Sequence, residues 1–167
     1  MQILKVLGLC VFLAGCTGNS KQIKKVCTSS LDFCTKHNIC FFKQDPKFFS
    51  QIEVENAIDL FIDVLPYLTS RKLSHEEIEH ALSGLIVQWS PVVIDLEGKR
   101  YLGLQLDKWM VVVLYKELND TAFFHELLHV VDKNVYNIDD VKHEDEEWWA
   151  CEEILNEIYY SSLVPSI

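Results

Sequence analysis

The spacing of the apolar residues changes along the chain, and this change restricts the fold more than any other feature. Between residues 50 and 68, apolar side chains recur at intervals of three and four, the period of an amphipathic helix. Ser74 and Glu77 have the form of a capping box, so a second helix is expected from His75 toward Leu85. Residues 86–115 are instead rich in β-branched and aromatic side chains, which favours strands. The order of these elements predicts an α+β domain.

The remaining elements follow from the same patterns. Strands are expected at residues 86–89, 92–96, 100–106 and 109–115, with a tight turn at 97–99, and a short strand is expected at 39–42. Because strands joined by short turns usually pair with each other, the sheet is predicted to be small and mainly antiparallel. A helix is then expected at 121–132, a loop at 133–142 and a final helix at 144–163.

The beginning of the chain has the character of a targeting segment. Its apolar run is too short to span a bilayer as a helix, so residues 1–15 are predicted to be a signal peptide. The sequence Leu13-Ala14-Gly15-Cys16 resembles the lipobox of bacterial lipoproteins. That resemblance implies cleavage before Cys16 and acylation of Cys16, with residues 16–25 as a polar tether and residues 26–167 as the folded domain. The mature protein is then expected on a membrane surface, on the periplasmic or cell-surface side. A plain secretory signal with an incidental cysteine is the alternative.

Four further cysteines, Cys27, Cys34, Cys40 and Cys151, belong to the expected folded domain. An even number in an exported chain predicts two disulfides. One of these bridges would join Cys151, in the last helix, to the N-terminal part of the domain and stabilise the fold by about 2–4 kcal/mol. The alternative is that all four are reduced thiols buried as small apolar groups.

The composition argues against one class of partner. The formal net charge of the chain is -10, and a negative protein repels the phosphate backbone. Nucleic acid is therefore not an expected partner. Hydrophobic residues make up 49% of the sequence, which is enough for a packed core and argues against disorder.

His125, Glu126 and His129 form the pattern His-Glu-x-x-His within the helix expected at 121–132. Residues four apart lie one turn apart on the same side of a helix, so both imidazoles can bind a single cation. Glu126 is offset from them and can contact a metal-bound water without taking a ligand position. Zinc lowers the pKa of such a water to about 7, and a nearby carboxylate can accept its proton. The pattern predicts a zinc site with His125 and His129 as ligands and Glu126 as general base.

The order of strand, motif helix, loop and acidic helix between residues 111 and 155 resembles that of the zincin metallopeptidases. Metzincins continue the motif with a Gly and then a His or Asp, but those places hold Asp132 and Val135, which excludes that subclass. The resemblance is therefore to the gluzincins, whose third ligand is a Glu from the next helix. The implied fold is a small sheet packed on the motif helix and on a following ligand helix.

The resemblance to gluzincins implies that Glu147 is the third zinc ligand, with Ala150 as the small residue one turn later. Two alternatives remain open. Glu146 differs from Glu147 only in its position around the helix. His143 follows the motif at a spacing similar to that in SprT-like peptidases, which use a histidine as third ligand.

Other residues near the motif have expected roles that depend on this resemblance. His143 or Tyr136 would donate a hydrogen bond to the oxyanion formed during hydrolysis. Asp132 would orient an imidazole or solvate the end of the helix. Trp148 and Trp149 are expected to pack in the core and its interfaces.

The implied function is zinc-dependent hydrolysis of an extracytoplasmic protein or peptide by a membrane-tethered enzyme. One alternative is a non-catalytic zincin-fold lipoprotein that acts as a binding or immunity module. Glu126 favours the enzyme, because a module that only binds metal needs no base at that position. A third possibility is a structural envelope lipoprotein in which the motif is accidental.

Overall fold

The computed structural model describes residues 31–42, 49–90, 94–96, 99–107, 109–114, 122–138 and 145–163. The predicted signal peptide and tether lie outside these residues, as do Cys16, Cys27 and His143. In these ranges, no helix has both the length and the apolar character needed to cross a membrane.

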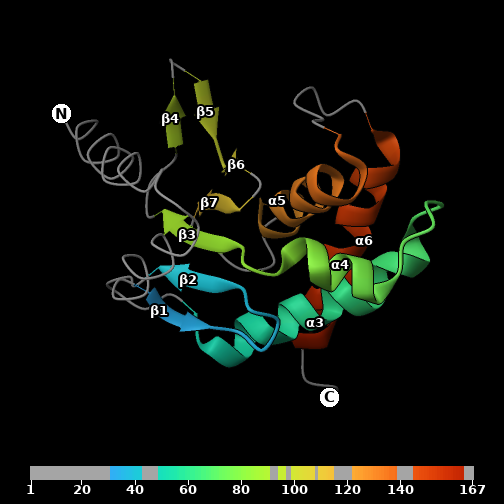
Figure 1. Ribbon diagram of the computed structural model, residues 1–167, viewed down its shortest axis with the longest axis horizontal. Coiled ribbons are helices and arrows are strands. Elements are labelled where there is room, and N and C mark those ends of the chain that lie inside the picture. Colours follow the sequence, from blue (N-terminus) through green and yellow to red (C-terminus); the bar gives the residue numbers. More distant parts are fainter. Residues whose placement is uncertain are drawn as a thin grey trace.

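The described strands form a five-stranded sheet and a separate two-stranded pair (Figure 1). The order in the larger sheet is β1 (Leu31–Cys34), β2 (Cys40–Phe42), β3 (Ile86–Ser90), β7 (Met110–Leu114) and β6 (Gly103–Asp107). The pair consists of β4 (Ile94–Leu96) and β5 (Lys99–Tyr101), which run antiparallel. The α+β class is thus confirmed.

The prediction of a mainly antiparallel sheet was wrong, because the sheet is mixed. β1 with β2 and β6 with β7 are antiparallel, whereas β3 runs parallel to both β2 and β7. The physical reason is that the segment after β3 does not pair with β3. β4 and β5 pair outside the larger sheet, and the β6–β7 pair then places β7 beside β3 in the same direction. The strand expected at 100–106 is accordingly divided between β5 and β6.

The first two described helices are α3 (Gln51–Leu68) and α4 (His75–Leu82), and both begin with a capping box. The Ser50 hydroxyl accepts from the Glu53 amide at 3.2 Å, and the Ser74 hydroxyl accepts from the Glu77 amide at 3.2 Å. Each carboxylate bonds back to its own serine, and these hydrogen bonds lower the pKa of Glu53 and of Glu77. The predicted start of the second helix is confirmed at the atomic level.

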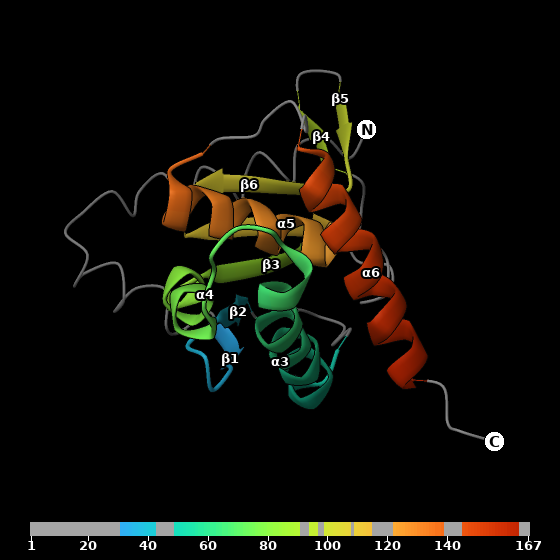
Figure 2. The ribbon, with the colours of Figure 1, turned by 90° about the vertical axis from the view of Figure 1, so that its right-hand side faces the viewer.

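The later helices are α5 (Ala122–Val131) and α6 (Glu146–Leu163), close to their predicted bounds. The loop expected after α5 instead opens with a π-helical turn, η2 (Asp132–Tyr136). Figures 1 and 2 show α3, α4, α5 and α6 gathered on one face of the five-stranded sheet, with α5 lying along β6 and β7. The β4–β5 pair projects beyond β6 (Figure 1).

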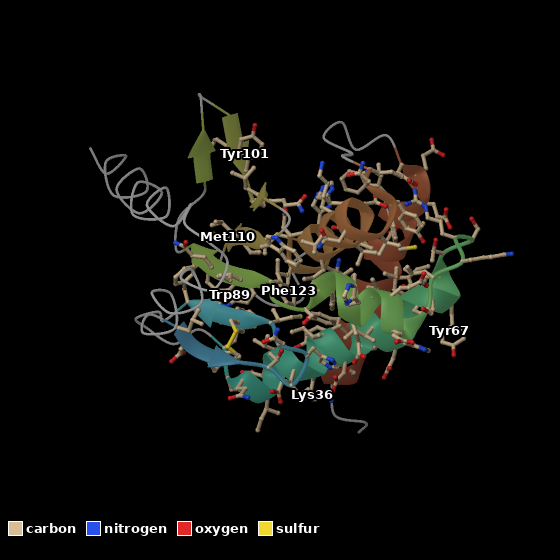
Figure 3. The ribbon with its side chains drawn as sticks, viewed as in Figure 1. Lys36, Tyr67, Trp89, Tyr101, Met110 and Phe123 are labelled. Carbon is tan, nitrogen blue, oxygen red and sulfur yellow. A yellow bond between two sulfur atoms is a disulfide. The ribbon has the colours of Figure 1, made fainter. Side chains whose placement is uncertain are left out.

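Aromatic side chains tie α5 to both layers. Phe123 packs on Trp89 of β3 with ring centroids 5.3 Å apart, and both side chains are labelled in Figure 3. Phe124 packs on Phe61 of α3 at 6.1 Å and on Tyr159 of α6 at 5.9 Å. Full burial of a large apolar side chain contributes about 1.5–3 kcal/mol. The backbone of α5 is therefore held firmly between the sheet and the neighbouring helices.

The structure contains one disulfide in its described part, between Cys34 of β1 and Cys40 of β2 (Figure 3). The expected bridge to the last helix is absent, because Cys151 is a free thiol that is 1% exposed. Cys151 lies inside the core, where burial raises the pKa of its thiol to about 11. A thiol packed in this way behaves as a small apolar side chain.

Candidate metal centre

α5 presents the two motif histidines on the same side. The Nε2 atoms of His125 and His129 are 3.0 Å apart, and their rings stand nearly perpendicular, at 83°. Both side chains are partly buried. Nitrogens at this separation can both lie about 2.0–2.1 Å from one zinc ion. The arrangement follows from the four-residue spacing, since each side chain leans over the preceding turn of the helix.

A carboxylate from α6 contacts the first histidine at Nδ1, the ring nitrogen that does not face His129. Glu152 Oε2 lies 2.8 Å from His125 Nδ1, and the Glu152 side chain is 6% exposed. A hydrogen bond at Nδ1 fixes the ring orientation and leaves Nε2 available for a cation. The sequence interpretation assigned no role to Glu152. The sequence shows only that Glu152 lies on α6, one turn after Trp148. The packing of α6 on α5 is what brings it to its partner.

Glu126 is offset from the histidines around α5 and faces the sheet. Its side chain packs against Gly103 of β6 and the residue is 3% exposed. Burial raises the pKa of Glu126 to about 7; the nearby His125 opposes this rise and Glu152 adds to it. Glu126 Oε2 has no hydrogen-bond partner in the described part of the chain. A carboxyl group with a pKa near neutrality is suited to accept and return a proton.

The histidines border a small recess between α5 and α6, of about 20 Å³, which is room for about one water. Its lining combines imidazoles, carboxylates and apolar side chains: His125, Leu128, His129, Asp132, Asp145, Trp148, Trp149 and Glu152. Trp148 is buried, as expected, but Trp149 is 45% exposed and its ring centroid lies 5.3 Å from that of His125.

Glu147, the expected third ligand, points to a different part of the molecule. Its carboxylate accepts from the Thr69 hydroxyl at 2.9 Å, from the Ser70 hydroxyl at 3.2 Å and from the Ser70 amide. Hydrogen bonding from the Ser70 amide is the main cause of a lowered pKa of Glu147. Neither Glu147 nor Glu146 is among the residues that line the recess. The structure therefore uses Glu147 to attach α6 to the segment between α3 and α4.

Arg71, from that same segment, connects two carboxylates of the recess. It pairs with Asp132 at 2.5 Å and with Asp145. Its guanidinium group lies over the rings of Trp148, at 4.6 Å, and Tyr136, at 5.2 Å. Burial raises the pKa of Asp132 to about 6, and Arg71 limits this rise. Sequence reasoning missed Arg71, because nothing in its neighbourhood along the chain marks it as part of a site.

This packing changes two of the expected roles. Asp132 lines the recess, but the bond shown by its carboxylate is to Arg71 and not to an imidazole. Tyr136 stacks on Arg71 and is not among the residues of the recess. Burial raises the pKa of Tyr136, so its hydroxyl keeps its proton at neutral pH.

The donors of the recess match zinc in type and, for the two histidines, in geometry. Zinc in proteins binds histidine nitrogens and carboxylate oxygens. Within the described ranges, no group of three or more His, Cys, Asp or Glu is arranged to hold a metal ion. His125 and His129 thus fit as two zinc ligands, and a carboxylate of the recess would have to move to become a third.

No protein-family model, curated protein or solved structure matches the chain. The chemistry assigned to the site therefore rests on its own residues.

Proposed function

We propose that this protein is a zinc-dependent peptidase in which His125 and His129 bind the metal and Glu126 is the general base. The observation that carries the proposal is the pair of imidazole nitrogens 3.0 Å apart, next to a buried Glu126 whose pKa is raised to about 7. These features correspond to the two requirements of metal-assisted hydrolysis, a place for the cation and a proton acceptor.

Zinc, when bound, supplies a polarised water and a positive charge at the reacting carbonyl. The residues of the chain do the rest. Glu152 orients His125, and Glu126 accepts the proton of the attacking water and returns it to the leaving amine. Bound zinc would keep Glu126 ionised, so its carboxylate would be able to accept that proton near neutral pH.

The third protein ligand is proposed to come from the recess. Glu152 already holds Nδ1 of His125, which is the side of the ring that faces away from the histidine pair. Asp132 and Asp145 remain, both held by Arg71. We propose that one of these two aspartates is the third ligand and that Arg71 retains the other.

The position of β6 supports a peptide as the substrate. Among the described strands, β6 is at the edge of the sheet, antiparallel to β7, and it lies against α5 next to Glu126 (Figure 2). An edge strand offers unpaired backbone groups to which an extended peptide can bond. A peptide bound there would pass close to the proposed base.

The proposal also places the protein on a membrane surface through acylated Cys16, which rests on the lipobox resemblance alone. Mass spectrometry of the membrane fraction should find the mature chain beginning with a lipid-modified Cys16. A soluble chain with an unmodified Cys16 would contradict this part of the proposal without affecting the rest.

Metal analysis and peptide cleavage together test the enzyme. The purified protein should hold one equivalent of zinc and cleave members of a quenched fluorescent peptide library. His129→Ala should lose the zinc, whereas Glu126→Gln should keep zinc and lose cleavage. A folded protein that holds zinc and cleaves no peptide would favour the non-catalytic binding module. Cleavage by Glu126→Gln at the parent rate would refute the role of the base.

A matched pair of variants on α6 tests the assignment of the carboxylates. Glu152→Gln should weaken zinc binding about 10-fold, because the support of His125 becomes weaker. Glu147→Ala should leave the zinc affinity unchanged and lower only the stability, since its contacts are with Thr69 and Ser70. The reverse result would restore Glu147 as the third ligand.

A further inference from the structure

Gly103 is the first residue of β6, at the edge of the described sheet, and lies against Glu126 of α5. A Cβ atom at this position would lie 2.3 Å from Glu126 Oε1 and 2.7 Å from both Cγ and Cδ. Real Cβ atoms essentially never come within 3.0 Å of another heavy atom in this way. No side chain can therefore stand at position 103 while Glu126 keeps its place.

The backbone gives no other reason for a glycine here. Among the described glycines, the positive φ angle belongs to Gly84, at 87°, and not to Gly103. Glycine also weakens a strand, because it has no side chain to pack and has more backbone freedom to lose on folding. What glycine provides at position 103 is the space that the Glu126 side chain fills.

No hydrogen bond to a described residue fixes Oε2 of this carboxylate. Glu126 Oε2 has no hydrogen-bond partner among the described residues, and the residue is 3% exposed. A buried carboxylate without a bond at one oxygen is held by the atoms packed around it. Gly103 supplies one wall of that surrounding.

We propose that Gly103 is the positioning residue for Glu126, and that its bare backbone forms a niche that holds the carboxylate between α5 and the sheet edge. Its importance for catalysis rests on the proposed function, in which Glu126 is the base. The niche sets how far the carboxylate extends from α5, so a methyl group there displaces the base. The atoms nearest to such a methyl group all belong to Glu126, so the imidazole pair is left in place.

Thermal unfolding of the metal-free protein tests the niche without any assay of activity. Gly103→Ala should lower Tm by about 5 °C in the parent chain, the effect expected of one extra buried methyl group. In a Glu126→Ala background the same substitution should lower Tm by less than about 2 °C, because the truncated side chain leaves the niche empty. Leu102→Ala is the matched control: Leu102 is the 45% exposed neighbour and should give the same shift in both backgrounds.

The outcomes separate the niche from the enzyme. Equal Tm losses for Gly103→Ala in the two backgrounds would overturn the proposal, because the glycine would then serve the backbone of β6. In the zinc-loaded protein, Gly103→Ala should keep the zinc affinity and KM while kcat falls about 10–100-fold. An unchanged kcat would overturn the positioning role. If the parent cleaves no peptide, the proposed function fails, and the unfolding comparison still decides the niche.

Discussion

Glu126→Gln should stabilise the metal-free protein, and the gain should grow with pH. The substitution keeps the shape of the side chain and removes the charge that is costly to bury. Glu126 is 3% exposed, and burial raises its pKa from 4.5 to about 7. The native state therefore binds a proton more tightly at this group than the unfolded state does.

The magnitude follows from linkage. Between about pH 4.5 and pH 7 the native protein holds a proton that the unfolded chain has lost, so the free energy of unfolding falls as pH rises. A pKa raised from 4.5 to about 7 corresponds to a loss of about 3 kcal/mol, complete above pH 7. The Gln variant has no such proton. Its stability should match that of the parent near pH 4.5 and exceed it by about 3 kcal/mol at pH 8.

Urea unfolding in the presence of a chelator, followed by tryptophan fluorescence from pH 4.5 to pH 8, measures this difference directly. The chelator matters, because zinc bound to His125 and His129 would stabilise the carboxylate and stabilise the native state by mass action. A difference between Glu126→Gln and parent that does not change with pH would refute the reasoning. It would mean that the carboxylate is hydrated in solution.

Three other groups give predictions of their own. Arg71→Ala should lower the free energy of unfolding by about 3 kcal/mol in urea titrations, because Asp132 would remain buried without its cation; a loss below about 0.5 kcal/mol would show that the pair is not formed. Asp59→Asn should lower the free energy of unfolding by about 0.5–1 kcal/mol at neutral pH, because it removes the bond to His37. Burial alone raises the pKa of Asp59, but Lys36 and His37 bring it below its ordinary value. This loss of stability should therefore vanish as pH falls below about 3.8. Cys151 should resist iodoacetamide in the native protein and react after denaturation, as judged by mass spectrometry; rapid native labelling would contradict its burial.

Local features of the chain were predictable because the interactions behind them are short in sequence. The capping box of Ser74 and Glu77 forms as expected, and His125 and His129 face the same side of α5. Both depend on residues three or four apart, and helix geometry alone brings such residues together. The bounds of the helices were close for the same reason.

The order of the strands was less predictable. The alternation of β-branched residues shows that a strand exists, but it does not show with which strand it pairs. β3 and β7 pair in parallel because the β4–β5 pair leaves the larger sheet, and no residue in β3 signals that event. The segment expected as one strand at 100–106 was divided for the same reason.

The sequence by itself determined the helices, the pair of histidines and the presence of a carboxylate between them. The tertiary structure decided what surrounds these groups: Glu152 behind His125, Gly103 against Glu126, and Arg71 beside the recess. Each of these neighbours is brought in by a different element, from α6, from β6 or from the segment between α3 and α4. Spacing along the chain carries information only over a few residues, whereas the charge state and position of Glu126 depend on burial by distant segments. The residues that define the type of chemistry are therefore visible in a short stretch of sequence, whereas their positions and charge states depend on tertiary packing.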